Sequence, residues 1–190
     1  MRNIIIIILL VFAGCDNENQ IDEVNEIENY SNPSSSINMA NINVNNDDIT
    51  DFYFTHENVG TTDEPMSAAT RFIALEPKNN YLLYKINYGY LPFAEGELIG
   101  ESMDSGFSWH SYSAQLININ WHIEHGWDDS WSGSWVDIND GYLPFALDLN
   151  DGLHYGWIKM SVESVYDSVS ITITDYGYNL LPGEPIIAGE

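Results

Sequence analysis

The sequence predicts an all-β fold: a single antiparallel β-sandwich or jelly roll that follows a disordered N-terminal tether. Apolar and polar residues alternate along many short runs, as in strands with one buried face. Turn-forming residues recur at intervals of roughly 8–12 residues. No long segment with helical periodicity occurs after residue 37. The length of 190 residues favours one domain.

The composition supports a folded core and excludes several classes of protein. Apolar residues make up 44% of the chain and aromatic residues 13%, which is enough to fill a core. The 29 acidic and 5 basic residues give a formal charge of −24, which repels phosphate backbones and argues against a nucleic-acid partner. The single cysteine excludes an internal disulfide framework and a cysteine-based zinc cluster.

The N-terminus has the pattern of an export signal. Arg2 precedes an apolar run from Ile4 to Ala13. This run is too short to span a bilayer, which takes about 20 residues, but it suits the apolar region of a signal peptide. Small residues, Ala13 and Gly14, come directly before Cys15.

The segment Val11-Phe12-Ala13-Gly14-Cys15 resembles the lipobox of bacterial lipoproteins. The resemblance implies cleavage after residue 14, lipid attachment at Cys15 and stable membrane anchoring by two or three acyl chains. An ordinary secretory signal that leaves a free thiol is the alternative. The predicted organisation is a signal peptide at 1–14, a lipidated cysteine and acidic flexible linker at 15–36, and a β-domain at 37–190.

The residues after the cysteine bear on the destination of the protein. Asp16-Asn17-Glu18 resembles the acidic signal that sends Bacteroidetes-type lipoproteins to the outer face of the outer membrane, whereas in enterobacteria an aspartate here indicates retention at the inner membrane. We expect surface display on the outer membrane. Residues 16–36 hold six acidic residues without apolar periodicity, as expected of a flexible tether.

Alternating patterns place the strands. In the segment 116–124, Ile117, Ile119 and Trp121 share one face with Ile123, while polar residues occupy the other face. Asn79 and its neighbours form a turn between two apolar runs. The strands are expected at or within 37–44, 52–54, 72–75, 81–84, 116–124, 136–138, 142–147, 155–165 and 168–174.

One hexapeptide, Gly-Tyr-Leu-Pro-Phe-Ala, occurs at 89–94 and again at 141–146. Two copies are too few for a repeat architecture, which takes at least three. Because proline avoids the central ladder positions of a sheet, both copies are predicted to form corners at edge strands.

The C-terminal part carries a second resemblance. It has Tyr155-Gly156-Trp157 in an apolar strand, then the strand Ser170–Tyr178, then Pro182–Gly189. This succession resembles the ending of a broad group of uncharacterised secreted and surface-anchored bacterial β-domains, closely over residues 137–189 and loosely over 37–136. The resemblance implies no catalytic residues.

The segment 43–51 resembles an oxygen-rich calcium loop. The positions that would supply oxygen ligands hold Asn43, Asn45, Asp47, Ile49 (through its carbonyl) and Asp51. Asn replaces Asp at the first position, and Asp48 stands where the loop needs glycine. A polar turn between strands is therefore the alternative to weak calcium binding.

Other polar patterns have structural interpretations. The segments 137–141 and 148–152 both read Asp-x-Asn-Asp-Gly, in which Asn-Asp-Gly predicts a turn. His122 and His125 would point to opposite faces of a strand, so surface histidines are expected rather than zinc ligands.

Tryptophans at even spacing form the most suggestive pattern. Trp127, Trp131 and Trp135 are interrupted by Asp128, Asp129, serine and glycine. Exposed rings beside carboxylates would form a platform on which sugars stack. The alternative is that these rings pack in the core, as Trp121 is expected to do.

Together these patterns predict a cell-surface lipoprotein with a non-catalytic binding or structural domain, whose partners are the membrane and a ligand such as polysaccharide or an envelope protein. An enzyme acting on the envelope or on glycans is the alternative. It rests on the abundance of carboxylates, since no serine-nucleophile motif is present.

Overall fold

The structure is a computed structural model that describes residues 41–60, 68–122, 126–127, 130–165 and 168–190. The predicted signal peptide, Cys15 and the tether lie outside these residues. The strands are β1 (Asn41–Ile42), β2 (Phe52–Gly60), β3 (Ala68–Pro77), β4 (Tyr81–Lys85), β5 (Leu98–Ile99), β6 (Phe107–His110), β7 (Ala114–His122), β8 (Gly126–Trp127), β9 (Gly141–Leu149), β10 (Gly152–Val165), β11 (Ser168–Tyr178) and β12 (Ile186–Ile187).

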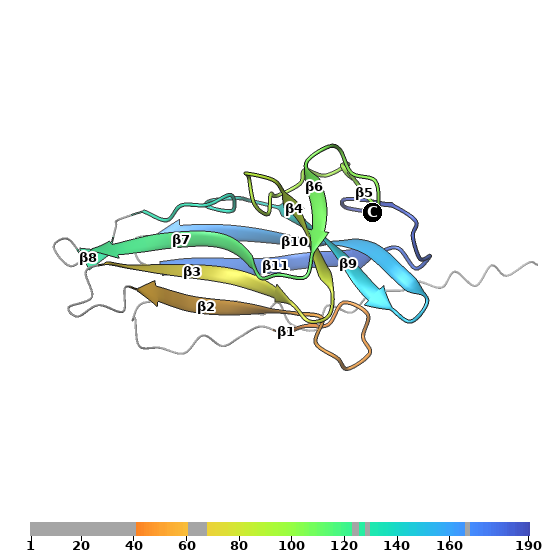
Figure 1. Cartoon of the computed structure of the whole chain (residues 1–190), viewed down its shortest axis with the longest axis horizontal. Helices are drawn as coiled ribbons and strands as arrows, with labels where there is room; N and C mark the ends of the chain where they lie inside the picture. Colours follow the sequence, from red (N-terminus) through yellow and green to blue (C-terminus); the bar gives the residue numbers. More distant parts are fainter. Residues whose placement is uncertain (1–40, 61–67, 123–125, 128–129, 166–167) are drawn as a thin grey trace, which may run out of the picture.

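Two five-stranded antiparallel sheets pack face to face, which confirms the predicted all-β sandwich (Figure 1). One sheet has the order β1-β2-β3-β7-β8, and the other has the order β11-β10-β9-β4-β6. Their inner faces meet in one apolar core; for example, the ring centroids of Phe52 on β2 and Phe145 on β9 lie 5.1 Å apart. Strand β7 has Ile117 and Ile119 buried in this core, with Asn118 and Asn120 more exposed, as the alternation predicts.

A second apolar layer covers the outer face of the β9–β10 sheet. Tyr142, Tyr155 and Trp157 alternate along their strands with residues of the main core, so they point to the opposite side. The small sheet formed by β5 and β12 lies over them and adds the fully buried Ile99. Both faces of this sheet are therefore buried, which explains the long apolar run in β9.

One long side of the sandwich is closed by the segment 130–140. Trp131 and Trp135 reach into the main core from this segment. The predicted strand at 136–138 is wrong, because these residues belong to a turn in which the amides of Val136 and Ile138 donate to the carbonyls of Gly133 and Trp135. Val136 and Ile138 are half-buried against the main core from this turn, so their apolar character did not indicate a strand.

The two copies of the hexapeptide lie side by side and differ in structure. The backbones of Phe93 and Tyr142 exchange two hydrogen bonds of 2.8 and 3.0 Å, although residues 89–94 form no strand. The second copy begins β9, an inner strand, so the prediction of an edge position is wrong for it. Pro144 has no N–H to donate to a neighbouring strand. On this side of β9, Tyr142 bridges to Phe93 and pairing with β4 starts at Phe145, so Pro144 lies in the gap between the two pairings.

Candidate functional site

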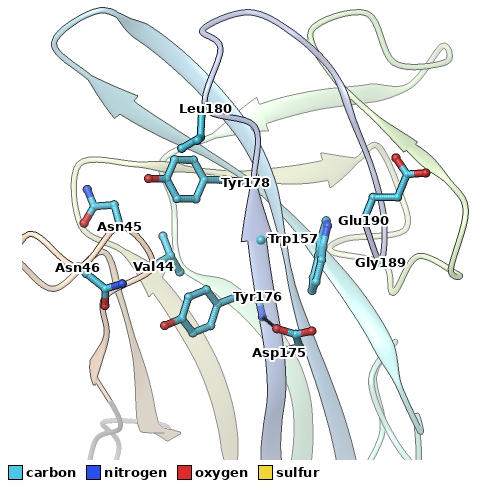
Figure 2. A pocket seen from close by; sticks show the side chains of 11 residues that line it. Val44, Asn45, Asn46, Trp157, Asp175, Tyr176, Tyr178, Leu180, Gly189 and Glu190 are labelled. Carbon is cyan, nitrogen blue, oxygen red and sulfur yellow. Dashed lines mark hydrogen bonds between the residues drawn. The ribbon is translucent and has the colours of Figure 1, made fainter. Parts of the chain in front are cut away.

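A groove of about 510 Å³ follows the free edge of β11 at the end where this strand finishes. The loop between β1 and β2 lines one side of it with Val44, Asn45 and Asn46, and Gly189 and Glu190 lie on the other side (Figure 2). A groove of this volume is within the range of small-ligand sites, about 300–1,000 Å³. It is therefore the candidate binding site.

Two tyrosine rings provide the aromatic surface of the groove. Tyr176 and Tyr178 are two residues apart on one strand, so their side chains leave the strand on the same side, about 7 Å apart. Figure 2 shows both rings directed towards the side of the groove that carries Val44, Asn45 and Asn46. Each is half-buried against the main core, which fixes the ring and leaves part of it accessible.

The backbone of β11 adds polar groups that face the groove. The amide of Asn179 donates to the carbonyl of Tyr155 on β10 at 2.9 Å. In an antiparallel pair, every second residue bonds to the neighbouring strand, so Asn179, Gly177 and Asp175 face β10. The amides and carbonyls of Tyr176 and Tyr178 therefore point away from β10. The Tyr176 amide donates to Oδ1 of Asp175 at 2.8 Å, whereas no described residue bonds the amide of Tyr178.

The charged side chains that line the groove are acidic. Asp175 and Glu190 are both exposed, and no lysine or arginine is among the described lining residues. Burial raises the pKa of the Tyr178 hydroxyl, and the negative charges of Asp51 and Asp47 raise it further. The groove therefore offers hydrogen-bond acceptors and a negative potential to a ligand.

Trp157 lies on the opposite side of β11 from the two tyrosines (Figure 2). Gly177, its cross-strand partner, makes room for the indole, because a Cβ at this position would lie 2.9 Å from Cζ2 of Trp157. Trp157 is 3% exposed, and no described residue accepts a hydrogen bond from its Nε1. A buried donor without a partner costs about 1–3 kcal/mol.

The residues predicted to bind calcium form a compact loop beside the groove. Asp51 is buried, and its Oδ2 accepts from the amide of Val44 at 2.9 Å while Asn80 approaches its Oδ1 at 3.3 Å. Asp47 accepts from the Ile49 amide and from the Asn45 side chain. Burial raises the pKa of Asp51.

These contacts are those of a hydrogen-bonded polar turn. Asn46 and Asp48 adopt left-handed backbone conformations, with φ of 56° and 64°, as asparagine and aspartate tolerate in turns. Among the described residues, no three or more histidine, cysteine, aspartate or glutamate side chains are grouped to hold a metal ion. Asn43 and Asn45 share the loop with the carboxylates, and Asn43 Oδ1 is buried without a described partner.

The tryptophan platform is corrected for two of its members. Trp131 is 6% exposed and Trp135 is fully buried, with its Nε1 donating to the carbonyl of Tyr90 at 2.9 Å. Neither ring has a face open to a sugar, because both are buried in the main core. The side chain of Trp127, together with Asp128 and Asp129, lies outside the described residues.

Sequence reasoning missed the groove because its residues come from four separate segments: 44–46, Trp157, 175–180 and 189–190. Tyr176 and Tyr178 carried a usable signal, since two aromatic residues at even spacing flank a glycine near the end of a strand. The loop at 44–46 and Glu190 carried none, since only the packing of the two sheets brings them to β11.

Comparison with protein-family models, with curated proteins and with solved structures gives no match for this chain. Within the described residues, no helix has the length and apolar character that crossing a membrane requires.

Proposed function

We propose that the protein is a cell-surface lipoprotein whose β-domain binds carbohydrate without catalysing a reaction. The groove along β11 is the binding site in this proposal. The observation that carries it is the pair of half-buried tyrosine rings, Tyr176 and Tyr178, placed beside carboxylates and free backbone groups. The lipid at Cys15 would hold the domain at the membrane.

The chemistry of the groove suits a polyhydroxylated ligand. Sugar rings present C–H faces that pack on aromatic rings, and their hydroxyl groups both donate and accept hydrogen bonds. Asp175, Glu190 and the carbonyls of Tyr176 and Tyr178 accept such donors, while the Tyr178 amide donates. Both rings are anchored on a rigid sandwich, so binding orders few side chains.

Binding is tested with the full chain carrying Cys15→Ser, which cannot be lipidated at that position. We expect Tyr176→Ala to weaken binding to a β-1,4-linked oligosaccharide by about 2- to 13-fold, the loss of one aromatic contact of about 0.5–1.5 kcal/mol. Titration calorimetry measures the affinity. Tyr112→Ala is the control, because Tyr112 is exposed and does not line the groove. Equal affinities for both variants would contradict the proposal.

Anchoring is tested by expression of the natural chain in a lipoprotein-producing bacterium. Wild-type protein is expected to incorporate labelled palmitate and to sediment with the outer membrane, because the acyl chains on Cys15 anchor it. The Cys15→Ser variant should do neither. Protease treatment of whole cells then reports surface display, and recovery of unlabelled wild-type protein in the soluble fraction would refute anchoring.

A further inference from the structure

We propose that the groove selects cationic amino sugars over neutral sugars and excludes acidic ones. This inference rests on the proposed function, because it names the class of carbohydrate that the same groove takes. The acidic side chains around β11, the position of the basic residues and the two tyrosine rings support it.

The charges near the groove are of one sign. Asp175 and Glu190 stand at its rim on the side of Trp157, as Figure 2 shows. Asp47 and Asp51 lie near enough to Tyr178 on the other side to raise the pKa of its hydroxyl. A protonated amine in the groove would therefore meet the carboxylates of Asp175 and Glu190, which line it.

Lys159, the basic residue opposite Asp175 on the neighbouring strand, does not neutralise Asp175 or Glu190. Its ammonium lies 3.5 Å from Oδ1 of Asp140 and 5.6 Å from the centre of the Tyr142 ring, both towards β9. Lys78 and Lys85 lie over other aromatic rings and do not line the groove. The negative potential of the groove is thus left for a ligand to neutralise.

An amino sugar matches the donors and acceptors that are present. Its ammonium group offers three donors to carboxylate and carbonyl oxygens, and a cation near the tyrosine rings gains a further electrostatic attraction. Its hydroxyl oxygens can accept from the Tyr178 amide, which points away from β10 into the groove. A uronic acid would instead place its carboxylate against Asp175 and Glu190.

The test compares three β-1,4-linked hexamers that differ at one substituent: glucosamine, N-acetylglucosamine and glucose. At pH 5.5, where the amine of glucosamine is charged, we expect the glucosamine hexamer to bind about fivefold tighter than the glucose hexamer. One carboxylate–ammonium pair at 4 Å in water gives about this factor. In 0.5 M NaCl the difference should fall below about twofold. A galacturonic acid hexamer should not bind detectably.

Matched variants assign the preference to the groove. Asp175→Asn with Glu190→Gln keeps the shapes and removes both charges, so it should abolish the preference for glucosamine while glucose still binds. Glu163→Gln with Glu184→Gln, two exposed acids outside the groove, removes the same charge and should leave the preference intact.

The possible failures are distinguishable. Binding of all hexamers with equal affinity, or a preference that survives in the groove variant, overturns the selection of amino sugars and leaves carbohydrate binding standing. Binding of none of the hexamers overturns the proposed function itself. Equal binding of a lysine hexapeptide, with the same dependence on Asp175 and Glu190, would show a general cation site and also overturn the selection of a sugar.

Discussion

At the scale of single residues, His154 connects three parts of the chain from a buried position. Its Nδ1 contacts the carbonyl of Asn179 at 2.9 Å, and its Nε2 contacts Oδ1 of Asp151 at 3.0 Å. Both partners are acceptors, so both bonds form together only when the ring carries two protons. The ring also meets Tyr178 edge-on, with centroids 6.2 Å apart, and so supports the wall of the groove.

This contact makes stability depend on pH through Asp151. The hydrogen bond to His154 lowers the pKa of the Asp151 carboxyl below its usual 3.8. A carboxyl with a lowered pKa stabilises the fold above its unfolded pKa and loses that contribution as the pH falls through the folded pKa. We predict that Asp151→Asn lowers the melting temperature at pH 4.5–5.5 and that this difference shrinks below pH 3.8.

The measurement is a series of melting curves between pH 2.5 and 5.5 for wild type and Asp151→Asn. Asp104→Asn serves as the control, since the Asp104 side chain is exposed and forms no hydrogen bond or ion pair with a described histidine. A difference between wild type and Asp151→Asn that stays constant down to pH 2.5 would contradict the prediction.

At the scale of elements, the two tryptophans of the segment 130–140 differ in one hydrogen bond. Both are buried, but Nε1 of Trp135 donates to the carbonyl of Tyr90, whereas Nε1 of Trp131 has no acceptor among the described residues. Phenylalanine removes the N–H in either case. We predict that Trp135→Phe lowers the free energy of unfolding by about 1–3 kcal/mol more than Trp131→Phe, because it leaves the Tyr90 carbonyl unsatisfied.

Urea unfolding of the two variants, followed by far-UV circular dichroism, checks this prediction. Each variant is the control for the other, since both lose similar volume from the same side of the core. Equal losses of unfolding free energy would show that packing alone, without the hydrogen bond, decides the contribution of Trp135.

The strands show how far local patterns reach at this scale. Alternation in β7 predicted the burial of Ile117 and Ile119, because successive side chains of a strand point to opposite faces and only one face lies on the core. The turn at Asn79 was also predictable, but the strands it joins belong to different sheets, because β4 pairs with β6 and β9. Turn chemistry specifies a bend, and the partner of each strand depends on contacts made elsewhere.

At the scale of the whole molecule, charge is the dominant property. Removal of Arg2 with the proposed signal peptide leaves 4 basic and 29 acidic residues, a net charge of 4 − 29 = −25. Self-repulsion of this size destabilises a compact state and is screened by salt. We predict that raising NaCl from 20 to 500 mM raises the melting temperature by about 2–4 °C, the shift that about 1 kcal/mol gives at this chain length.

The same experiment separates screening from calcium binding. At constant ionic strength, 2 mM CaCl₂ and 2 mM EDTA are expected to give the same melting temperature, because Asp47 and Asp51 are held in the hydrogen bonds of their own loop. A higher melting temperature in calcium than in magnesium, lost in Asp47→Asn, would instead show that the loop binds calcium.

The sequence alone determined the fold class, and it also predicts that the N-terminus is a signal peptide followed by a lipidated cysteine. Period-two alternation and frequent turns specify antiparallel sheets through local sterics and burial, and the structure confirms that class. The apolar run that precedes Gly14 and Cys15 predicts a lipid anchor from local chemistry, independent of the fold.

Tertiary structure decided what identical or similar local sequences become. Gly-Tyr-Leu-Pro-Phe-Ala is an irregular segment at 89–94 and an inner strand at 141–146, because only the second copy has β10 beside it. Likewise Trp131 and Trp135 became core residues, and Tyr176 and Tyr178 became the walls of a groove, once the two sheets packed. Burial depends on what the rest of the chain places opposite a residue, and local sequence does not contain that information.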